Sequence, residues 1–376
     1  MDTLGGSTLK TSTRKSSAYN RDFEQHLVDH GIYPSHYNFP DDREPARPNN
    51  EKEILERLAQ SRSSLSPSRF SDKAFASFVR TTSQALTEAD LMRRSFPTIV
   101  GDVSIPSAGE LPFGNLEPMT DGTLVDAKPD FYDGANPEQI HQRVRKELAS
   151  YIIPSTEHNA PLLPNFFTEA KGPDGSAAVA KRQACYDGAL GARAMRSLQR
   201  FGMESSKETC DNNAYAITST YHDGNLKLYT THPVCTAERS NSIEYHMTQI
   251  GGWDLTGSSG QFREGVSAFR NARDLAKEER DKMIIAANGN APDTHDGTIS
   301  SNSSGHTRLT SLTNEPDSLD SETSADELAL LKAHTHKRQG TVLKASPDMR
   351  RHKKRRSFKA SFRCAQGHPS LTQLDC

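Results

Sequence analysis

The stretch Asn165-Phe166-Phe167-Thr168-Glu169-Ala170-Lys171-Gly172 constrains the fold of this chain more than any other. Two aromatic residues lead into a carboxylate and an ammonium two positions apart, and a Gly-Pro-Asp-Gly turn follows. In a β-strand, residues i and i+2 point to the same face, so Glu169 and Lys171 are expected to project side by side. A buried strand rarely keeps two charges on one face unless they pair or perform chemistry.

A second acidic strand end lies upstream, at Lys128-Pro129-Asp130-Phe131-Tyr132-Asp133-Gly134. Two carboxylates can hold a hard cation such as Mg²⁺, which prefers oxygen ligands. Such an ion lowers the pKa of a water molecule and stabilises charge on a phosphate, and a neighbouring lysine can assist. We therefore predict a metal-dependent phosphodiesterase site in which Asp130 and Glu169 bind Mg²⁺ and Lys171 is the catalytic cation. The alternative is a structural ion pair between Glu169 and Lys171.

A competing acid-x-Lys register exists at Asp126-Ala127-Lys128, with Asp102 as its upstream acid. Pro129 directly after Lys128 fits poorly inside a central strand, because proline cannot donate to the hydrogen-bond ladder. No glycine turn and capped helix follow Lys128, whereas both follow Lys171. The register at Glu169 is therefore favoured.

The flanking pattern predicts an α/β domain with a central mixed β-sheet flanked by helices. Ser71 and Thr87 are placed to cap helices, and Ser176 to cap a long helix that ends near residue 201. Asp223-Gly224 between two apolar runs predicts a hairpin, and Gln261–Ala287 a long amphipathic helix. We also expect strands at Ile99-Val100 and Leu124-Val125, and one helix from Asn136-Pro137 to about Tyr151.

Only 34% of the chain is hydrophobic, which predicts disordered segments around a folded core. The expected organisation is a folded domain with flanking segments: a disordered N-terminus at 1–20, an extended docking arm at 21–48, the α/β domain at 50–288, a disordered linker at 289–340 and a basic tail at 341–376.

Residues 341–363 carry nine Lys and Arg residues against one Asp, although the whole chain has a net charge of −2. The run Lys353, Lys354, Arg355 and Arg356 suits nuclear import or contact with the phosphates of DNA or RNA. The alternative is a solvated tail without a partner.

The five cysteines show no C-x-x-C spacing, which predicts an intracellular reducing compartment without a disulfide framework or structural zinc. No run of 18 apolar residues is present, so we expect no transmembrane helix and no membrane partner. His222, His232 and His246 lack ligand spacing and are expected in surface or capping positions. The pattern specifies no oligomeric state.

The motifs resemble the PD-(D/E)xK nuclease-like superfamily: Pro129-Asp130, then Glu169-Ala170-Lys171, then a helix bearing Lys181, Gln183 and Tyr186. Longer stretches around these residues, including Gln183-Ala-Cys-Tyr-Asp-Gly and Tyr229-Thr-Thr-His-Pro, resemble a family of uncharacterised fungal proteins with such a domain, over roughly residues 20–288. The resemblance implies a mixed sheet, a Mg²⁺ site, and supporting or nucleic-acid-binding roles for Lys181, Gln183 and Tyr186. From its own position on a helix, Tyr186 is expected in the core rather than at the site.

This chain departs from the superfamily pattern in three ways. Asp130 and Glu169 are 39 positions apart, which implies an insertion between strands often joined by a tight turn. The helix has Gln183-x-x-Tyr186 where a related subgroup has Gln-x-x-x-Tyr. The glutamate that an N-terminal helix often contributes has only Glu56 and Glu88 as candidates. Since the superfamily includes members that do not cleave, a catalytically inactive module for nucleic-acid binding or protein–protein interaction is the alternative function.

Overall fold

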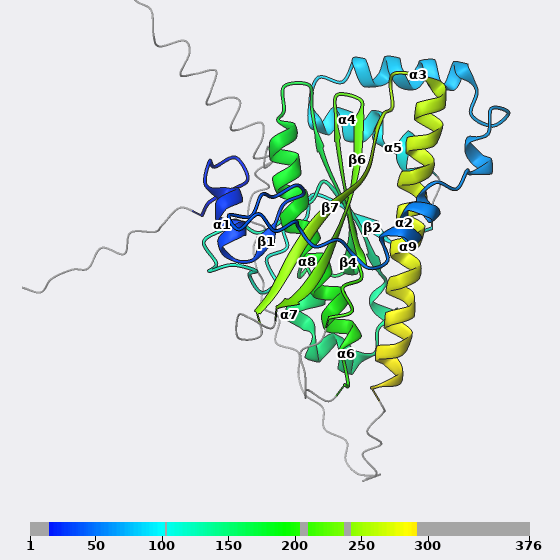
Figure 1. Ribbon diagram of the computed structural model, residues 1–376. Helices are drawn as coiled ribbons and strands as arrows, with labels where there is room; N and C mark the ends of the chain where they lie inside the picture. Colours follow the sequence, from blue (N-terminus) through cyan, green and yellow to red (C-terminus); the bar gives the residue numbers. More distant parts are fainter. Residues whose placement is uncertain (1–14, 102–103, 204–209, 237–241, 292–376) are drawn as a thin grey trace, which may run out of the picture. The chain divides into compact units, whose positions relative to one another are not determined.

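A computed structural model describes residues 15–101, 104–203, 210–236 and 242–291 of the chain (Figure 1). These residues contain a mixed seven-stranded sheet with the strand order β1-β7-β6-β5-β4-β3-β2. The pairs β1–β7 and β4–β5 are parallel and the other neighbours are antiparallel. The predicted central mixed sheet flanked by helices is confirmed. The strands are β1 Ile32–Tyr33, β2 Ser107–Ala108, β3 Phe131–Ala135, β4 Leu162–Lys171, β5 Ala216–His222, β6 Asn225–Thr236 and β7 Ser242–Asp254.

Two long helices cover opposite faces of the sheet, α8 (Ala177–Gln199) on one and α9 (Ser259–Gly289) on the other (Figure 1). Shorter helices pack beside α8 or α9 or fill the connections between strands. They are α1 Phe23–Asp29, α2 Glu51–Leu58, α3 Asp72–Ser83, α4 Glu88–Arg94, α5 Phe96–Val100, α6 Gln142–Glu147 and α7 Ala149–Ile152, with single 3₁₀ turns at Ser63–Leu65 and Pro137–Gln139.

Alternation along β4 divides its side chains between the two layers. Phe166 and Ala170 pack in the core beneath α9, whereas Phe167 packs in the core beneath α8. Glu169 and Lys171 have the same parity as Phe167, so they point toward α8. The period of the strand therefore assigns the charged pair to the α8 side.

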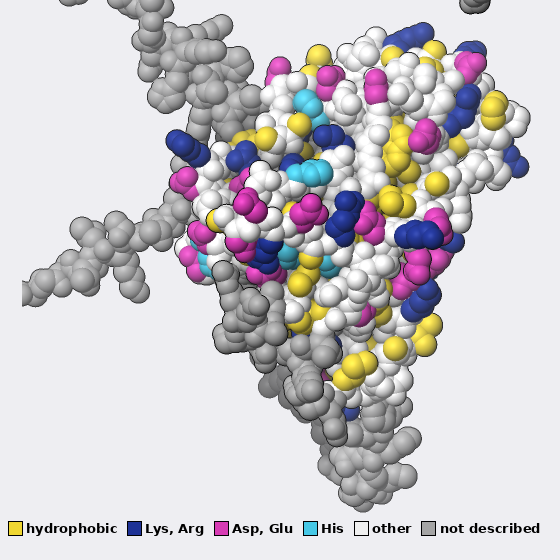
Figure 2. Space-filling model, viewed as in Figure 1, with side chains coloured by type: hydrophobic (Ala, Val, Ile, Leu, Met, Phe, Trp, Pro, Cys, Tyr) yellow, Lys and Arg dark blue, Asp and Glu magenta, His cyan; other side chains and the backbone are white. Residues whose placement is uncertain are grey.

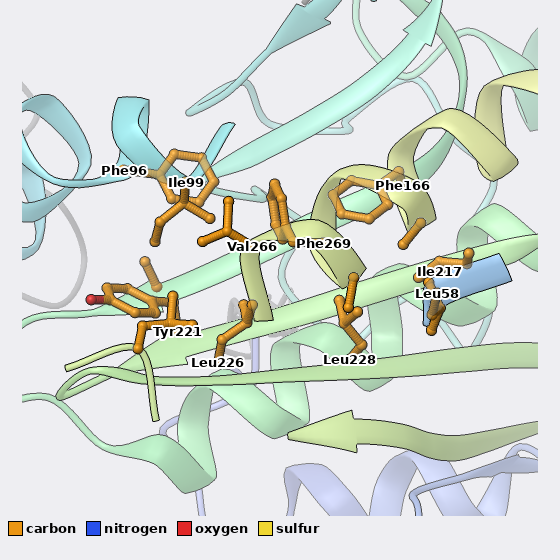
Figure 3. Packing of buried hydrophobic residues seen from close by; sticks show 14 of the residues in the cluster. Leu58, Phe96, Ile99, Phe166, Ile217, Tyr221, Leu226, Leu228, Val266 and Phe269 are labelled. Carbon is orange, nitrogen blue, oxygen red and sulfur yellow. The ribbon is translucent and has the colours of Figure 1, made fainter. Parts of the chain in front are cut away.

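The core on the α9 side joins the sheet to α9 and to the helices before β2. Figure 3 shows Val266 and Phe269 projecting from α9 toward the strands, with Phe96 and Ile99 of α5 beside them. The sheet contributes Phe166, Ile217, Tyr221, Leu226 and Leu228 to the same cluster. Burial of this apolar surface is the main favourable contribution to packing α9 on the sheet.

Small residues allow α8 to approach the sheet closely. A Cβ atom on Gly188 would lie 2.3 Å from Thr231 Oγ1, and one on Gly191 would lie 2.7 Å from the Phe167 ring. The Ala- and Gly-rich composition of this helix thus sets its distance from the strands, and with it the distance of α8 side chains from Glu169.

Local sequence signals predicted several element boundaries correctly. The Ser71 and Thr87 side chains cap α3 and α4 by accepting hydrogen bonds from the amides of Ala74 and Asp90, the third residue of each helix. Asp223 and Gly224 both have positive φ angles, at 47° and 77°, as a type I′ turn between β5 and β6 requires. In each case the chemistry that decides the structure lies within a few residues.

Three predicted elements were wrong. Ile99 and Val100 end helix α5 instead of forming a strand, and Leu124 makes only an isolated bridge to Ser16. The predicted helix from Asn136 to Tyr151 is divided into a 3₁₀ turn, α6 and α7. Its apolar residues Ile140 and Val144 are nevertheless buried. The helical spacing of apolar residues therefore predicted the buried face correctly, but it did not show where the helix is interrupted.

The segment expected to be an extended arm packs against the domain and contains a helix. Phe23 of α1 meets Tyr186 of α8 edge to face, with ring centroids 6.3 Å apart. Strand β1 then pairs in parallel with the edge of the sheet at β7. This segment covers a sheet edge that would otherwise expose unpaired backbone groups.

Cys210 and Cys235 form a disulfide, with their Cα atoms 5.5 Å apart. Spacing alone did not predict this pair, because the two cysteines are 25 positions apart, with β5 and most of β6 between them. The cysteine pattern therefore no longer supports the predicted reducing compartment. Cys185 is buried and free.

The predicted N-terminal tail to residue 14, most of the linker and the basic tail lie outside the described residues. Lys353, Lys354, Arg355 and Arg356 belong to that part. Among the residues that the structure describes, none of the helices is long and apolar enough to cross a membrane.

Asp133 of β3 and Arg273 of α9 form a fully buried ion pair. Nε and Nη2 of Arg273 donate to the two carboxylate oxygens of Asp133 at 2.7 and 2.8 Å, and both side chains have 0% exposure. The pair is bidentate, which fixes α9 relative to the strand that leads out of Asp130.

We predict that Asp133→Ala lowers the free energy of unfolding by about 3–5 kcal/mol, because it leaves the Arg273 charge buried and unpaired. Equilibrium urea denaturation measures the change. The matched control is Glu147→Ala, which breaks the exposed pair with Arg143 and should cost less than about 1 kcal/mol. Equal losses in the two variants would contradict this role for the buried pair.

Candidate metal-binding site

The pairing of β3 with β4 brings Asp130 beside Glu169 despite their separation in sequence. Phe131 is opposite Thr168 in the antiparallel register, so the preceding Asp130 lies next to the following Glu169. The Ala170 amide donates to Asp130 Oδ2 at 2.6 Å and fixes the carboxylate at the strand end. Residues 136–161, which hold α6 and α7, form the insertion expected between these strands.

Lys171 lies at the centre of a cluster of carboxylates. Its Nζ is 3.1 Å from Glu88 Oε2 and 3.8 Å from both Asp130 Oδ2 and Glu169 Oε2. Glu169 is 1% exposed and Lys171 is 2% exposed, so these two side chains are almost completely withdrawn from water.

Glu88 is the residue that the N-terminal helices contribute to the cluster. It is the first residue of α4, directly after the Thr87 cap. The end of β4 passes so close that a Cβ atom on Gly172 would lie 2.8 Å from the Glu88 amide nitrogen. Glycine at this position therefore permits the contact. The other candidate, Glu56, pairs with Lys52 on the surface.

Asp187 is a site residue that the sequence did not reveal. It is buried on α8, the helix toward which Glu169 points, and its negative charge raises the pKa of the Glu169 carboxyl. The available signal was its position in the Tyr186-Asp187-Gly188 stretch on a helix packed against the sheet. A carboxylate beside Gly188 in an otherwise apolar helix face is the pattern that would have identified it.

The cluster has more acids than its single ammonium can neutralise. Burial lowers the pKa of Lys171, but the carboxylates of Asp130, Glu169 and Glu88 outweigh this and hold it above its ordinary value. Burial raises the pKa of Asp130 and Glu169 well above the usual range, and the neighbouring carboxylates raise them further. Burial also raises the pKa of Asp187 to about 7. The lysine is therefore charged, while the acids compete for protons or for a cation.

The donor set fits a hard divalent cation. Both carboxylate oxygens of Glu169 are buried and have no hydrogen-bond donor among the described residues. One oxygen from each of Glu88, Glu110 and Asp130 also lies within 4.8 Å of the others. Glu110 is the exposed member of the group and pairs with Lys128 at 2.9 Å. Mg²⁺ prefers carboxylate oxygens whose lone pairs do not already accept hydrogen bonds.

The other expected site residues, Lys181, Gln183 and Tyr186, lie in different environments. Lys181 Nζ donates to the backbone oxygen of Ser35 at 3.0 Å, so its described contact is with the N-terminal segment. Gln183 is half-buried on the same helix, and its Oε1 lacks a donor among the described residues. Tyr186 is buried in the core cluster beneath α8.

The competing register does not gather a comparable cluster in the described part of the chain. Asp126 pairs with Lys15 at the surface, and Lys128 with Glu110. Asp102 lies outside the described residues.

The expectation of surface positions for the histidines was wrong for His232 and His246. Both are buried and face each other across β6 and β7, with ring centroids 5.9 Å apart. Burial, followed by the neighbouring His246, lowers the pKa of His232 to about 4. The two rings are therefore neutral core residues near neutral pH.

The raised pKa of Asp187 predicts a pH-dependent stability in metal-free protein. Between about pH 4 and pH 7 the unfolded chain releases this proton while the folded chain keeps it, so the free energy of unfolding falls as pH rises. Asp187→Asn removes the titration and keeps the size of the side chain. We expect the variant to gain stability over the wild type across this window, by up to about 1.4 kcal/mol per pH unit.

Urea denaturation in a chelating buffer at several pH values measures the difference. Asp126→Asn, at an exposed acid, is the control and should give a difference that is flat with pH. A flat difference for Asp187→Asn as well would contradict the assigned protonation of Asp187.

Comparison with known proteins gives one family and no characterised relative. The family model described as "Domain of unknown function (DUF7924)" matches residues 46–287. No curated protein and no solved structure matches the chain. The matched range includes every residue of the carboxylate cluster around Lys171. The chain therefore belongs to the DUF7924 family of domains of unknown function.

Proposed function

We propose that the domain is a nuclease-like, Mg²⁺-dependent phosphodiesterase that acts on DNA or RNA. The observation that carries this proposal is the convergence of Glu88, Asp130 and Glu169 on Lys171, with both oxygens of Glu169 lacking a donor. A structural ion pair would need one acid for one base. The surplus of buried acids has to be offset by protons or by a cation, and we assign this role to a cation.

In this proposal Asp130 and Glu169 hold the ion, and Glu88 or Glu110 completes its ligands. When bound, Mg²⁺ lowers the pKa of a water molecule and neutralises charge on a phosphate. The ammonium of Lys171, fixed by Glu88, orients the attacking water and stabilises negative charge as it develops. The Ala170 amide keeps Asp130 aimed at the same point.

Two observations support DNA or RNA as the substrate: the resemblance to the PD-(D/E)xK motif and the basic charge of the C-terminal region. Phosphodiester hydrolysis is the chemistry that the PD-(D/E)xK resemblance implies for Asp130, Glu169 and Lys171. The basic run Lys353–Arg356 supports contact with a nucleic-acid backbone and import into a nucleus.

Burial favours a second function, a catalytically inactive module that binds nucleic acid or protein. Glu169 and Lys171 are 1% and 2% exposed, so a phosphate would have to reach them past Glu88 and Glu110. If the entrance does not open, the cluster would serve as a buried polar network that stabilises the fold.

Two substitutions distinguish these functions. In Glu169→Gln, the affinity for Mg²⁺ or Mn²⁺ should fall at least about tenfold and cleavage should be lost, because a charged ligand is removed. In Lys171→Met, cleavage should fall about 100- to 1000-fold, while metal binding is retained or strengthened since the competing ammonium is gone. Calorimetry and a cleavage assay on the same samples measure both effects.

Asp126→Asn serves as the control, because this acid belongs to the rejected register and pairs with Lys15 at the surface. It should change neither readout. Absence of Mg²⁺ and Mn²⁺ binding by the wild-type chain would rule out the catalytic proposal and leave the binding module.

A further inference from the structure

A second group of ligand side chains lies on the N-terminal segment, away from the carboxylate cluster. His26 on α1 and His30 at its C-terminal end are four residues apart, so they share one helical face. Their rings are 4.6 Å apart between centroids. His26 Nε2 is 3.0 Å from Asp121 Oδ1, in the loop before Leu124. Figure 2 shows histidine and acidic side chains gathered over the region of α1 and β1.

The spacing of the ligand atoms suits a small metal ion. One nitrogen from each imidazole and one oxygen of Asp121 all lie within 4.8 Å of one another. In a tetrahedral zinc site with bonds of about 2.0–2.1 Å, ligand atoms are roughly 3.4 Å apart. The His26–Asp121 distance is already shorter than this, so modest side-chain rotations would bring the third ligand into range.

Further hydrogen bonds orient the ligand side chains. His30 Nδ1 lies 2.8 Å from the backbone oxygen of His26, so Nδ1 carries the proton and Nε2 keeps its lone pair. The hydroxyl and amide of Thr123 donate to Asp121 Oδ1 at 2.6 and 3.1 Å. Such second contacts typically fix the tautomer of a metal-binding histidine and the direction of a carboxylate.

We propose that His26, His30 and Asp121 bind a divalent transition-metal ion of the Zn²⁺ class, with water as the fourth ligand. Two imidazoles and one carboxylate select such an ion over Mg²⁺, which prefers oxygen ligands. The site is thus chemically distinct from the carboxylate cluster around Lys171. Asp121 is half-exposed, at 48% of its side chain, so an ion can enter from solvent.

The bound ion joins two segments that are distant in sequence. Helix α1 packs on α8 through Phe23 and Tyr186, while Arg193 of α8 holds the loop before Asp121 by donating to the Glu117 backbone oxygen at 2.5 Å. Ser16 hydrogen-bonds the backbone of Thr123 and Val125 beside the site. An ion held by His26, His30 and Asp121 therefore clamps the N-terminal segment onto the domain.

The test is a Zn²⁺ titration of the full-length, metal-stripped chain by calorimetry, with excess Mg²⁺ to occupy oxygen-only sites. The wild type should bind one Zn²⁺ at this site. His26→Ala, His30→Ala and Asp121→Asn should each weaken that binding by about 10- to 100-fold or more. Zn²⁺ should raise the melting temperature of the wild type and not that of His30→Ala.

The matched control is His158→Ala, because His158 is exposed and its ring lies 3.1 Å from the side-chain oxygen of the adjacent Asn159, away from His26, His30 and Asp121 in the sequence. It should bind Zn²⁺ like the wild type. Co²⁺ provides a second readout, since the wild type should give the visible absorption of a tetrahedral N/O site and His30→Ala should lose it. Melting curves without metal verify that each variant is folded. Unchanged Zn²⁺ affinity in both His26→Ala and His30→Ala would overturn the proposal, whatever the outcome of the Mg²⁺ experiments.

Discussion

The attraction between the Lys171 ammonium and the carboxylates around it is the interaction on which the arrangement at this end of the sheet depends. A buried ammonium costs several kcal/mol unless charges of opposite sign surround it. Here Glu88, Asp130 and Glu169 supply them, from a helix N-terminus and two adjacent strands. The single positive charge of Lys171 cannot neutralise all three carboxylates, so any remaining negative charges repel one another. Ion pairs with Lys171 therefore stabilise the cluster, and its excess negative charge favours the binding of a further cation.

The rest of the fold holds these groups in place from both sides. Gly188 and Gly191 bring α8 close to β4 and so bring Asp187 to Glu169. On the other face, the bidentate Arg273–Asp133 pair anchors β3, three residues beyond Asp130. Gly172 lets the end of β4 approach α4 and its first residue, Glu88. The site depends on close backbone approaches more than on any single long-range contact.

The sequence predicted correctly those features that depend on interactions between residues close together in the chain. The period of β4, the caps at Ser71 and Thr87 and the Asp223-Gly224 turn each depend on neighbours a few residues away. It also predicted that Asp130, Glu169 and Lys171 would meet, from the same-face spacing of Glu169 and Lys171 and from the resemblance to the PD-(D/E)xK motif. Asp187, the Cys210–Cys235 disulfide and the buried His232 were missed. Their environments arise from packing between elements far apart in sequence, which no local spacing encodes.

The most direct test of the central claim, that this cluster is a metal centre, is anomalous diffraction from crystals of the domain soaked in Mn²⁺. The account predicts an anomalous peak at about 2–2.5 Å from carboxylate oxygens of both Asp130 and Glu169, with Lys171 alongside. Soaked crystals that give no peak there, with Glu169 bonded only to protein groups, would contradict it. The cluster would then be a structural charge network.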